Sequence, residues 1–465
     1  MQPGQRKEYK NILESEAIGR LLFKLSGPVF MGMFVQSLYN VISTVFLGRY
    51  VGALSIAGLA IAFPLQMLGM AFGSLSGVGG SSLISRLLGA RQYERAEKAL
   101  GNGILLGLLL SGTVGVVLLP FMDFWLRLIG ASKDVLPYAH DYMIFVGVGI
   151  MLQIVSVTLL NSARGEGNTR VGMVAQMSGA LLSIIFSYIF IVWLHMGIKG
   201  AGLAVLSAQI VAAGYLGLYY LNGNSYLKLR RINLKPDFHI MKEILAIGVG
   251  AFGQMFAGSL STMIINTMVV RYGGDYAVGA FGVVQRIIMF TNLPTMVISQ
   301  SSQPIIGFNY GARRFGHLLK AFNMAVVLSF VIGVGGFLIV YFIPEDLMRI
   351  FSSDPRLISL GSDAARRMLI ALPIIGAMNI GTMTFQAIGQ ARRAFIAALS
   401  RPVFILCPTI FLLGRFFGLN GIWYTFPVSD VFTVSLITIL FLPILRHFRS
   451  QARSPGQVAL ASQSQ

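Results

Sequence analysis

The strongest constraint on the fold of this chain is an internal repeat, because a pattern of residues in its first half recurs in its second half. Arg49 and Arg271 lie 222 positions apart, and the same interval separates several further pairs of identical residues. These pairs are Tyr50 and Tyr272, Gly52 and Gly274, Gly89 and Gly311, Arg91 and Arg313, Lys98 and Lys320, and Gly167 and Gly389. By Gly197 and Gly418 the separation has changed only to 221. Two copies of one unit, joined by a linker, predict two similar lobes with a cleft between them.

The repeated unit is too apolar for a water-soluble core, which indicates that the fold is built in lipid. Of the 465 residues, 55% are hydrophobic and 11% are charged, whereas about 25% are charged in a typical soluble domain. Charged or Gly/Pro-rich breaks separate twelve apolar stretches, each as long as the ~20 residues that cross a bilayer. They are residues 21–47, 56–87, 100–121, 137–162, 170–194, 200–222, 240–270, 277–307, 319–343, 366–388, 394–416 and 420–445. The sequence therefore predicts an all-α polytopic membrane protein with twelve transmembrane helices.

The number of helices in each copy fixes how the two copies are related. Six is an even number, so both copies enter the membrane in the same direction and should be related by a pseudo-two-fold axis along the membrane normal. We expect an N-lobe over residues 1–222, which includes a cytoplasmic N-terminal tail, and a cytoplasmic linker over residues 223–239. A C-lobe over residues 240–449 and a disordered cytoplasmic tail over residues 450–465 should follow.

The net charge of +19 is a signal of membrane topology. Most of the 36 Lys and Arg fall in the N-terminal tail, the central linker and every second connection, and the C-terminal region is also basic. Arg401 is grouped with Arg392 and Arg393 in one such connection, after the tenth span. Because positive charge marks cytoplasmic segments, both termini are predicted to be cytoplasmic, and the basicity requires no nucleic acid.

The sequence contains no pattern typical of catalysis or of a metal centre. Cys407 is the single cysteine, which excludes an internal disulfide framework. The five histidines lack metal-ligand spacing, and no phosphate-binding loop of the Walker type is present. We therefore expect a protein that is not an enzyme, that has no cofactor and that is not powered by ATP.

One acidic residue lies inside an apolar span, where a charge is energetically unfavourable. Sixteen of the 17 acidic residues, Glu166 among them, fall in tails, connections or span ends, but Asp430 lies well inside the twelfth span. A carboxylate there costs several kcal/mol unless it is paired, protonated or in contact with water. Arg286, inside the eighth span, lies at a similar depth of roughly 15 Å. We predict that Asp430 and Arg286 form an ion-coupling pair that depends on protonation of Asp430; the alternative is a purely structural ion pair.

Amide and hydroxyl side chains form a second class of candidates. Several of them recur at three- and four-residue steps, which places them on one stripe of a helix, and similar groups occur on other spans. The candidates are Gln36, Tyr39, Asn40 and Ser43 on the first span, Gln153 and Asn161 on the fourth, Gln254 and Asn266 on the seventh, Asn292, Gln300 and Gln303 on the eighth, and Asn379 on the tenth. They are predicted to line a water-filled substrate cavity; hydrogen bonding between helices is the alternative for any single residue.

Five segments resemble the MATE family, the multidrug and toxic compound extrusion transporters, in its bacterial MepA-like branch. They are QSLYNVISTVFLGRYVG at 36–52, GVGGSSLISRLLGAR at 77–91, NSARGEGN at 161–168, QPIIGFNYGAR at 303–313 and PVSD at 427–430. The resemblance covers nearly the whole chain. It implies two six-helix lobes around a V-shaped central cleft, and export of organic cations or other amphipathic molecules in exchange for Na⁺ or H⁺.

The chain departs from the family pattern where ion coupling is usually placed. Ser43 stands at the usual acidic position of the first span, and Ser187 stands at another in the fifth. A serine hydroxyl carries no proton to exchange near neutral pH. Ser187 is therefore added to the cavity-lining candidates, and Asp430 becomes the leading candidate for coupling.

These observations together predict a secondary active exporter that works by alternating access in the cytoplasmic (inner) membrane. Its partners should be amphipathic small molecules and membrane lipids, with no nucleic acid, and we expect it to act as a monomer. The coupling ion, H⁺ or Na⁺, stays open. A flippase for lipid-linked precursors is the main alternative, and a membrane enzyme or a passive channel is a third.

Overall fold

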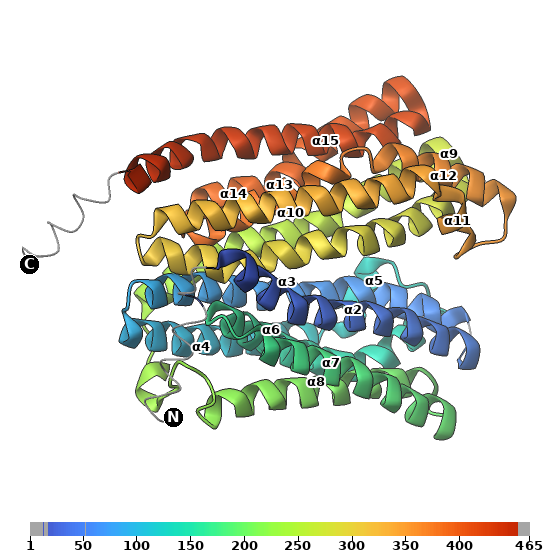
Figure 1. Ribbon diagram of the computed structural model, residues 1–465. Helices are drawn as coiled ribbons and strands as arrows, with labels where there is room; N and C mark the ends of the chain where they lie inside the picture. Colours follow the sequence, from blue (N-terminus) through green and yellow to red (C-terminus); the bar gives the residue numbers. More distant parts are fainter. Residues whose placement is uncertain (1–12, 14–16, 52, 454–465) are drawn as a thin grey trace, which may run out of the picture. The chain divides into compact units, whose positions relative to one another are not determined.

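The computed structural model describes residues 13, 17–51 and 53–453, which form helices and their connections without any strand among them (Figure 1). The first half contains α2 (Ile18–Tyr50), α3 (Ala53–Gly89), α4 (Tyr93–Leu118), α5 (Met122–Ile129), α6 (Leu136–Gly165), α7 (Thr169–Ser187), the π-helix η1 (Tyr188–Trp193) and α8 (Gly197–Leu221). After the 3₁₀ turn η2 (Arg231–Leu234) come α9 (Phe238–Gly311), α10 (Phe315–Phe342), α11 (Pro344–Arg349), α12 (Pro355–Met368), α13 (Leu372–Ala387), α14 (Ala391–Leu399), the π-helix η3 (Ser400–Ile405) and α15 (Leu406–Arg453).

Nine helices in the described ranges are long and apolar enough to cross a membrane, and the bent pair α12–α13 supplies a tenth span. Two of the nine are far longer than one crossing. Gly274 interrupts α9, and Gly418 interrupts α15, each with a positive φ and non-helical ψ. Glycine adopts such angles without a steric penalty, so the chain turns at these two points and each long helix contains two spans. This accounts for the twelve predicted helices.

The chain folds as two compact units, which are described here one at a time. Unit 1 contains residues 23–255, and unit 2 contains residues 256–453 together with the short segment 17–22. The division falls at Met255 and Phe256, inside α9, and not at the linker 223–239 that separates the two sequence repeats. The linker and the first turns of α9 therefore belong structurally to unit 1.

Buried polar side chains of α4 attach the linker to unit 1. Glu97, which is 9% exposed, accepts hydrogen bonds from the backbone N–H of Lys228 (3.3 Å) and from the side-chain amide of Asn233 (3.4 Å). Asn102, which is 1% exposed, accepts one from the backbone N–H of Asp237 (2.8 Å). Since buried backbone groups need partners, these two side chains stabilise an otherwise irregular segment against the helix.

The end of α6 provides a further attachment for the same segment. The carboxylate of Glu166, which directly follows α6, is fully buried and accepts a hydrogen bond from the Tyr226 backbone N–H (3.2 Å). The Tyr226 ring packs edge-on against Tyr93, with 6.0 Å between the ring centroids. Sequence reasoning placed Glu166 among connection residues, but the linker covers it.

Close packing against α3 explains why the start of α9 belongs to unit 1. A Cβ atom on Gly248 of α9 would overlap the carbonyl oxygen of Leu75, and one on Gly79 of α3 would overlap that of Ile244. The two backbones can approach this closely only because both positions lack a side chain. Arg86 Nη2 also lies 3.1 Å from Glu243 Oε1. The glycine-rich segment of α3 thus serves helix packing.

Each unit has its own buried core. In unit 1, apolar side chains from α3, α5, α6 and α8 meet around Leu65, Leu126, Met143 and Ile150. In unit 2, α10 packs on α13 and α13 on α15. Residues 450–453 form the last turn of α15, so helical backbone extends into the segment that the sequence assigned to a disordered tail. Residues 454–465 lie outside the described part of the chain.

Candidate functional site

Asp430 is the most deeply buried acidic group in the spans of unit 2, with no exposed surface. It lies on the second span of α15, among hydroxyl residues that bond to their own helix. Ser429 donates to the carbonyl of Phe426 (2.8 Å), and Thr433 donates to that of Ser429 (2.7 Å). These hydroxyls are therefore occupied by the backbone, and the charge of Asp430 has to be balanced from another helix.

The balancing group is Arg401. Its Nε atom donates to Asp430 Oδ1 over 2.5 Å. The second carboxylate oxygen, Oδ2, is buried and has no hydrogen-bond partner among the residues that the structure describes. The side chain of Arg401 is 32% exposed, whereas that of Asp430 is 1% exposed. The pair therefore joins a buried carboxylate to a cation that reaches the surface of unit 2.

A local break in helix geometry holds Arg401 in place. Arg401 belongs to the π-helix η3, and the next residue is Pro402, which has no N–H to donate to the helical ladder. The carbonyl of Pro402 accepts hydrogen bonds from Ser261 Oγ of α9 (2.7 Å) and from Cys407 Sγ (3.1 Å). The wide turn is thus fixed from a second helix, which is typical of π-bulges near functional sites.

The pairing of Asp430 with Arg286 that we predicted from the sequence is wrong, because Asp430 bonds to Arg401. Arg286 lies on an exposed face of α9 and forms no ion pair within the described ranges. Depth in the membrane was similar for both residues, but depth does not determine which way a helix turns its side chains. Arg401 was overlooked because an arginine followed by proline, after two other arginines, looks like a connection.

The first repeat has no counterpart of this pair. The repeat interval of 222 relates Arg401 to Gly179, and the later interval of 221 relates Asp430 to Gln209. In unit 1, a Cβ at Gly179 would lie 3.4 Å from Ala212 Cβ and 3.7 Å from the Ala208 carbonyl oxygen. In the first repeat, Gly179 and Gln209, which carry no charge, therefore stand at the positions of the charged pair of unit 2.

Unit 1 instead contains a cluster of neutral hydroxyl and amide groups. The Tyr39 hydroxyl of α2 faces the hydroxyls of Ser43 and Ser183. Tyr142 of α6 lies near Tyr39 and accepts a hydrogen bond from Gln66 Nε2 (3.2 Å). Of these residues, sequence reasoning identified Tyr39 and Ser43 only. Ser183 lies one turn before the candidate Ser187, and this spacing was the available signal.

The other predicted cavity residues are distributed over both units. Asn161, Ser187 and Gln303 are buried; Gln153, Asn292, Gln300 and Asn379 are half-buried; Gln36, Gln254 and Asn266 are exposed. The side chain of Asn40 lies outside the described part of the structure. Asn161 donates to the Val157 carbonyl of its own helix (2.8 Å), and Thr295 donates to Asn292 Oδ1. A role in substrate binding stays a prediction for these residues.

The described residues contain no group of three or more His, Cys, Asp or Glu side chains that could hold a metal ion. Within the spans of unit 2, the Arg401–Asp430 pair contains a buried carboxylate, with 1% of the Asp430 side chain exposed.

Comparisons with known proteins agree with the repeat and with the fold. The family model MatE matches the chain twice, over residues 28–189 and over residues 251–410. The multidrug export protein MepA of Staphylococcus haemolyticus is 27% identical over 431 residues, which cover 92% of this chain and 94% of that protein. The protein of the same name from Staphylococcus aureus strain NCTC 8325 is 25% identical over 432 residues, with 92% and 95% covered.

Two solved structures show the same likeness in three dimensions. The MATE multidrug transporter DinF-BH, solved in complex with R6G, is 36% identical, has a TM-score of 0.86 and covers 92% of this chain and 96% of its own. A crystal structure of MATE in the bent conformation has a TM-score of 0.90 at 23% identity, with 96% and 99% covered. The second comparison concerns the fold alone.

Proposed function

Because this chain belongs to the MatE family of multidrug transporters, we propose that it exports amphipathic small molecules, organic cations among them. The chain is a multi-pass membrane protein. We place it in the cytoplasmic membrane with both termini on the cytoplasmic side, as the distribution of Lys and Arg predicts. Export would proceed by alternating access, driven by an ion gradient.

The observation that carries the mechanism is the contact between Arg401 and Asp430. A buried carboxylate with one bonded and one unbonded oxygen is a group that protonation changes strongly. Protonation removes the negative charge, which weakens the attraction for Arg401 and lets its guanidinium move toward the exposed side. The pair is therefore a two-state element that a proton gradient can bias.

The same contact favours H⁺ over Na⁺ as the coupling ion. A guanidinium already lies against Oδ1, and a second cation at the same carboxylate would be repelled strongly in this poorly solvated place. In unit 1, Ser43 and Ser187 offer hydroxyls that carry no exchangeable proton near neutral pH. We therefore assign the coupling step to unit 2.

Transport into proteoliposomes tests the proposal. A fluorescent organic cation is followed with a proton gradient or a sodium gradient imposed separately, for the wild type, Asp430→Asn, Arg401→Gln and a control. The control is Asp275→Asn, which removes an exposed acidic group of unit 2. We expect transport driven by the proton gradient, its loss in both variants of the pair, and its retention in the control.

Other outcomes would change the assignment in distinct ways. Transport that follows the sodium gradient alone would contradict H⁺ coupling but leave drug export intact. Proton-driven transport that survives Asp430→Asn would remove Asp430 from the coupling step. If neither gradient drives transport, drug export itself loses its support.

A further inference from the structure

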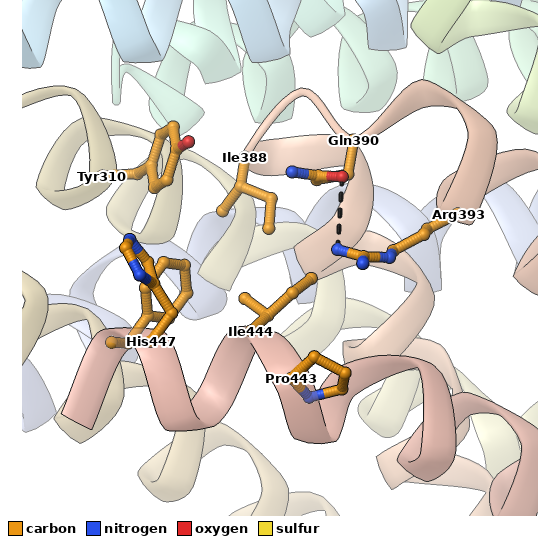
Figure 2. A pocket seen from close by; sticks show the side chains of 8 residues that line it. Tyr310, Ile388, Gln390, Arg393, Pro443, Ile444 and His447 are labelled. Atoms are coloured by element: carbon orange, nitrogen blue, oxygen red, sulfur yellow. Dashed lines mark hydrogen bonds between the residues drawn. The ribbon is translucent and has the colours of Figure 1, made fainter. Parts of the chain in front are cut away.

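Unit 2 contains a cavity of about 270 Å³ at the end of its helix bundle where α9 and α13 stop and α15 nears its last turns. Its wall consists of apolar and aromatic side chains, with the polar side chains of Gln390 and Arg393 at one end. Figure 2 shows Gln390 and Arg393 on one side and the rings of Tyr310 and His447 on the other, with Ile388 and Ile444 between them.

The polar end of this cavity is preformed. Arg393 Nη1 donates to Gln390 Oε1 over 3.4 Å, so the guanidinium is held at the wall while other donors stay available. Ile388 and Ile444 are both buried and form an apolar floor beside it. A ligand that fits must therefore have an anionic or strongly accepting group next to an apolar segment.

The surroundings of the cavity are strongly basic. The connections and helix ends that meet there contain Arg313, Arg314, Lys320, Arg392, Arg393, Arg446, Arg449 and Arg453. The segments 311–320, 387–400 and 440–453 contain no acidic residue. With no carboxylate in these segments to neutralise it, this positive charge attracts anions to the cavity.

The first repeat has an acidic side chain of its own at the corresponding place. The interval that pairs Gly167 with Gly389 also pairs Glu166 with Ile388. In unit 1 the Glu166 carboxylate is buried under the linker, where the Tyr226 ring packs on Tyr93. In unit 2 the counterpart rings are those of Phe315 and His447, 6.3 Å apart, but Ile388 stands where unit 1 has the glutamate.

Continuation of α15 leaves this place open in unit 2. Whereas α8 ends at Leu221 and the chain then folds over Glu166, α15 continues as a helix to Arg453. No described segment of unit 2 therefore supplies an anionic group to the cavity. Its size is slightly below the roughly 300–1,000 Å³ of sites for drug-sized ligands, which suits a head group and the first part of a chain.

We propose that this cavity binds the phosphate head group of an anionic membrane phospholipid, with Arg393 and Gln390 on the phosphate. Part of an acyl chain lies against Ile388 and Ile444. The cavity is at the level where the spans end, which is where lipid head groups lie. Basic pockets between transmembrane helices are known to take such head groups. This site is independent of the Arg401–Asp430 pair.

Native mass spectrometry of the full chain in detergent tests the proposal. The probes are phosphatidylglycerol, phosphatidylcholine with the same acyl chains, and soluble glycerol phosphate. The variants are Arg393→Gln and, as a matched control at the same end of unit 2, Arg449→Gln. We expect phosphatidylglycerol to bind more tightly than phosphatidylcholine, and Arg393→Gln to weaken its binding by about fivefold. Arg449→Gln should weaken it by less than about twofold.

A second variant, Ile388→Glu, introduces the glutamate side chain that unit 1 has at this place, where it would fill the apolar floor with a polar group, and it should also lower the binding of phosphatidylglycerol. If this variant does not fold, Arg393→Gln still decides the question. Equal binding of the two lipids, or equal losses in Arg393→Gln and Arg449→Gln, would overturn the site. Binding of glycerol phosphate as tight as that of the lipid would show that the phosphate comes from solution.

Discussion

The hydroxyl of Ser225 lies 2.8 Å from both carboxylate oxygens of Glu166, in a place that has no exposed surface. This contact joins the end of α6 to the linker within unit 1. Burial raises the pKa of the Glu166 carboxyl to about 8, although hydrogen bonds from Ser225, Tyr226 and Tyr220 act in the opposite direction. The folded protein therefore keeps a proton on Glu166 near neutral pH.

This proton makes the stability of unit 1 depend on pH. The pKa of an ordinary glutamate is 4.5, so between pH 4.5 and 8 the folded state holds a proton that the unfolded state has lost. The stabilisation is complete below pH 4.5 and declines as the pH rises toward 8. In thermal unfolding, Glu166→Gln should remove this decline, which is on the order of 5 kcal/mol for the full shift. Glu94→Gln, at an exposed position, should keep the decline in stability with rising pH. If Glu166→Gln declined as much as Glu94→Gln, the prediction would be contradicted.

The two halves of the buried ion pair should respond differently to mutation. Arg401→Gln leaves the Asp430 carboxylate buried without its partner, which costs about 3–5 kcal/mol. Asp430→Asn leaves Arg401, which is 32% exposed and can be solvated, so it should cost less. Adding Asp430→Asn to Arg401→Gln should restore part of the stability that the single variant lost. A loss in the double variant equal to the sum of both single losses would show that the two residues act independently.

The close approach of α3 and α9 should not tolerate a side chain. Gly248→Ala places a methyl group against the Leu75 carbonyl, and overpacking of this kind costs about 1–3 kcal/mol. Gly258→Ala, on the same helix, has open space around the new Cβ and should be neutral or slightly stabilising. Thermal unfolding of both variants in one detergent compares them directly, and equal effects would refute the packing explanation.

Ser261 should matter through the π-helix that it holds. Ser261→Ala removes the hydrogen bond to the Pro402 carbonyl (2.7 Å), which is worth about 1 kcal/mol, and loosens the turn that orients Arg401. We expect slower proton-driven transport with little loss of expression. Thr262→Ala is the control, since the Thr262 hydroxyl is exposed and bonds to its own helix (2.9 Å). Equal transport rates in Ser261→Ala and Thr262→Ala would show that the hydrogen bond to the π-helix does not contribute to proton coupling.

Sequence patterns predicted the architecture of this protein well, because lipid imposes simple rules of length and polarity. The repeat between Arg49 and Arg271 is confirmed by the two matches of one family model. The sequence placed Asp430 inside a span, and in the structure it lies on the second span of α15 and is buried. Its partner could not be predicted, because partner choice depends on how α15 and η3 turn their side chains.

Glu166 shows a second limit of sequence reasoning. Its neighbours Arg164, Gly165, Gly167 and Asn168 are typical of an exposed connection, and nothing local indicates that it is buried. Its burial is produced by Ser225 and Tyr226, about 60 residues later along the chain. Only the folded structure brings these segments together.

The attachment of the linker to unit 1 also determines where this gene can be divided. A cut between the repeats near residue 230 would separate Glu97 from the side-chain amide of Asn233, and Asn102 from the backbone N–H of Asp237, and would expose both buried side chains on the first fragment. The second fragment would begin with the turns of α9 that pack on Gly79, now without a partner. Co-expression of two half-genes should therefore succeed only when the first extends beyond Met255, although the two sequence repeats meet upstream of that point.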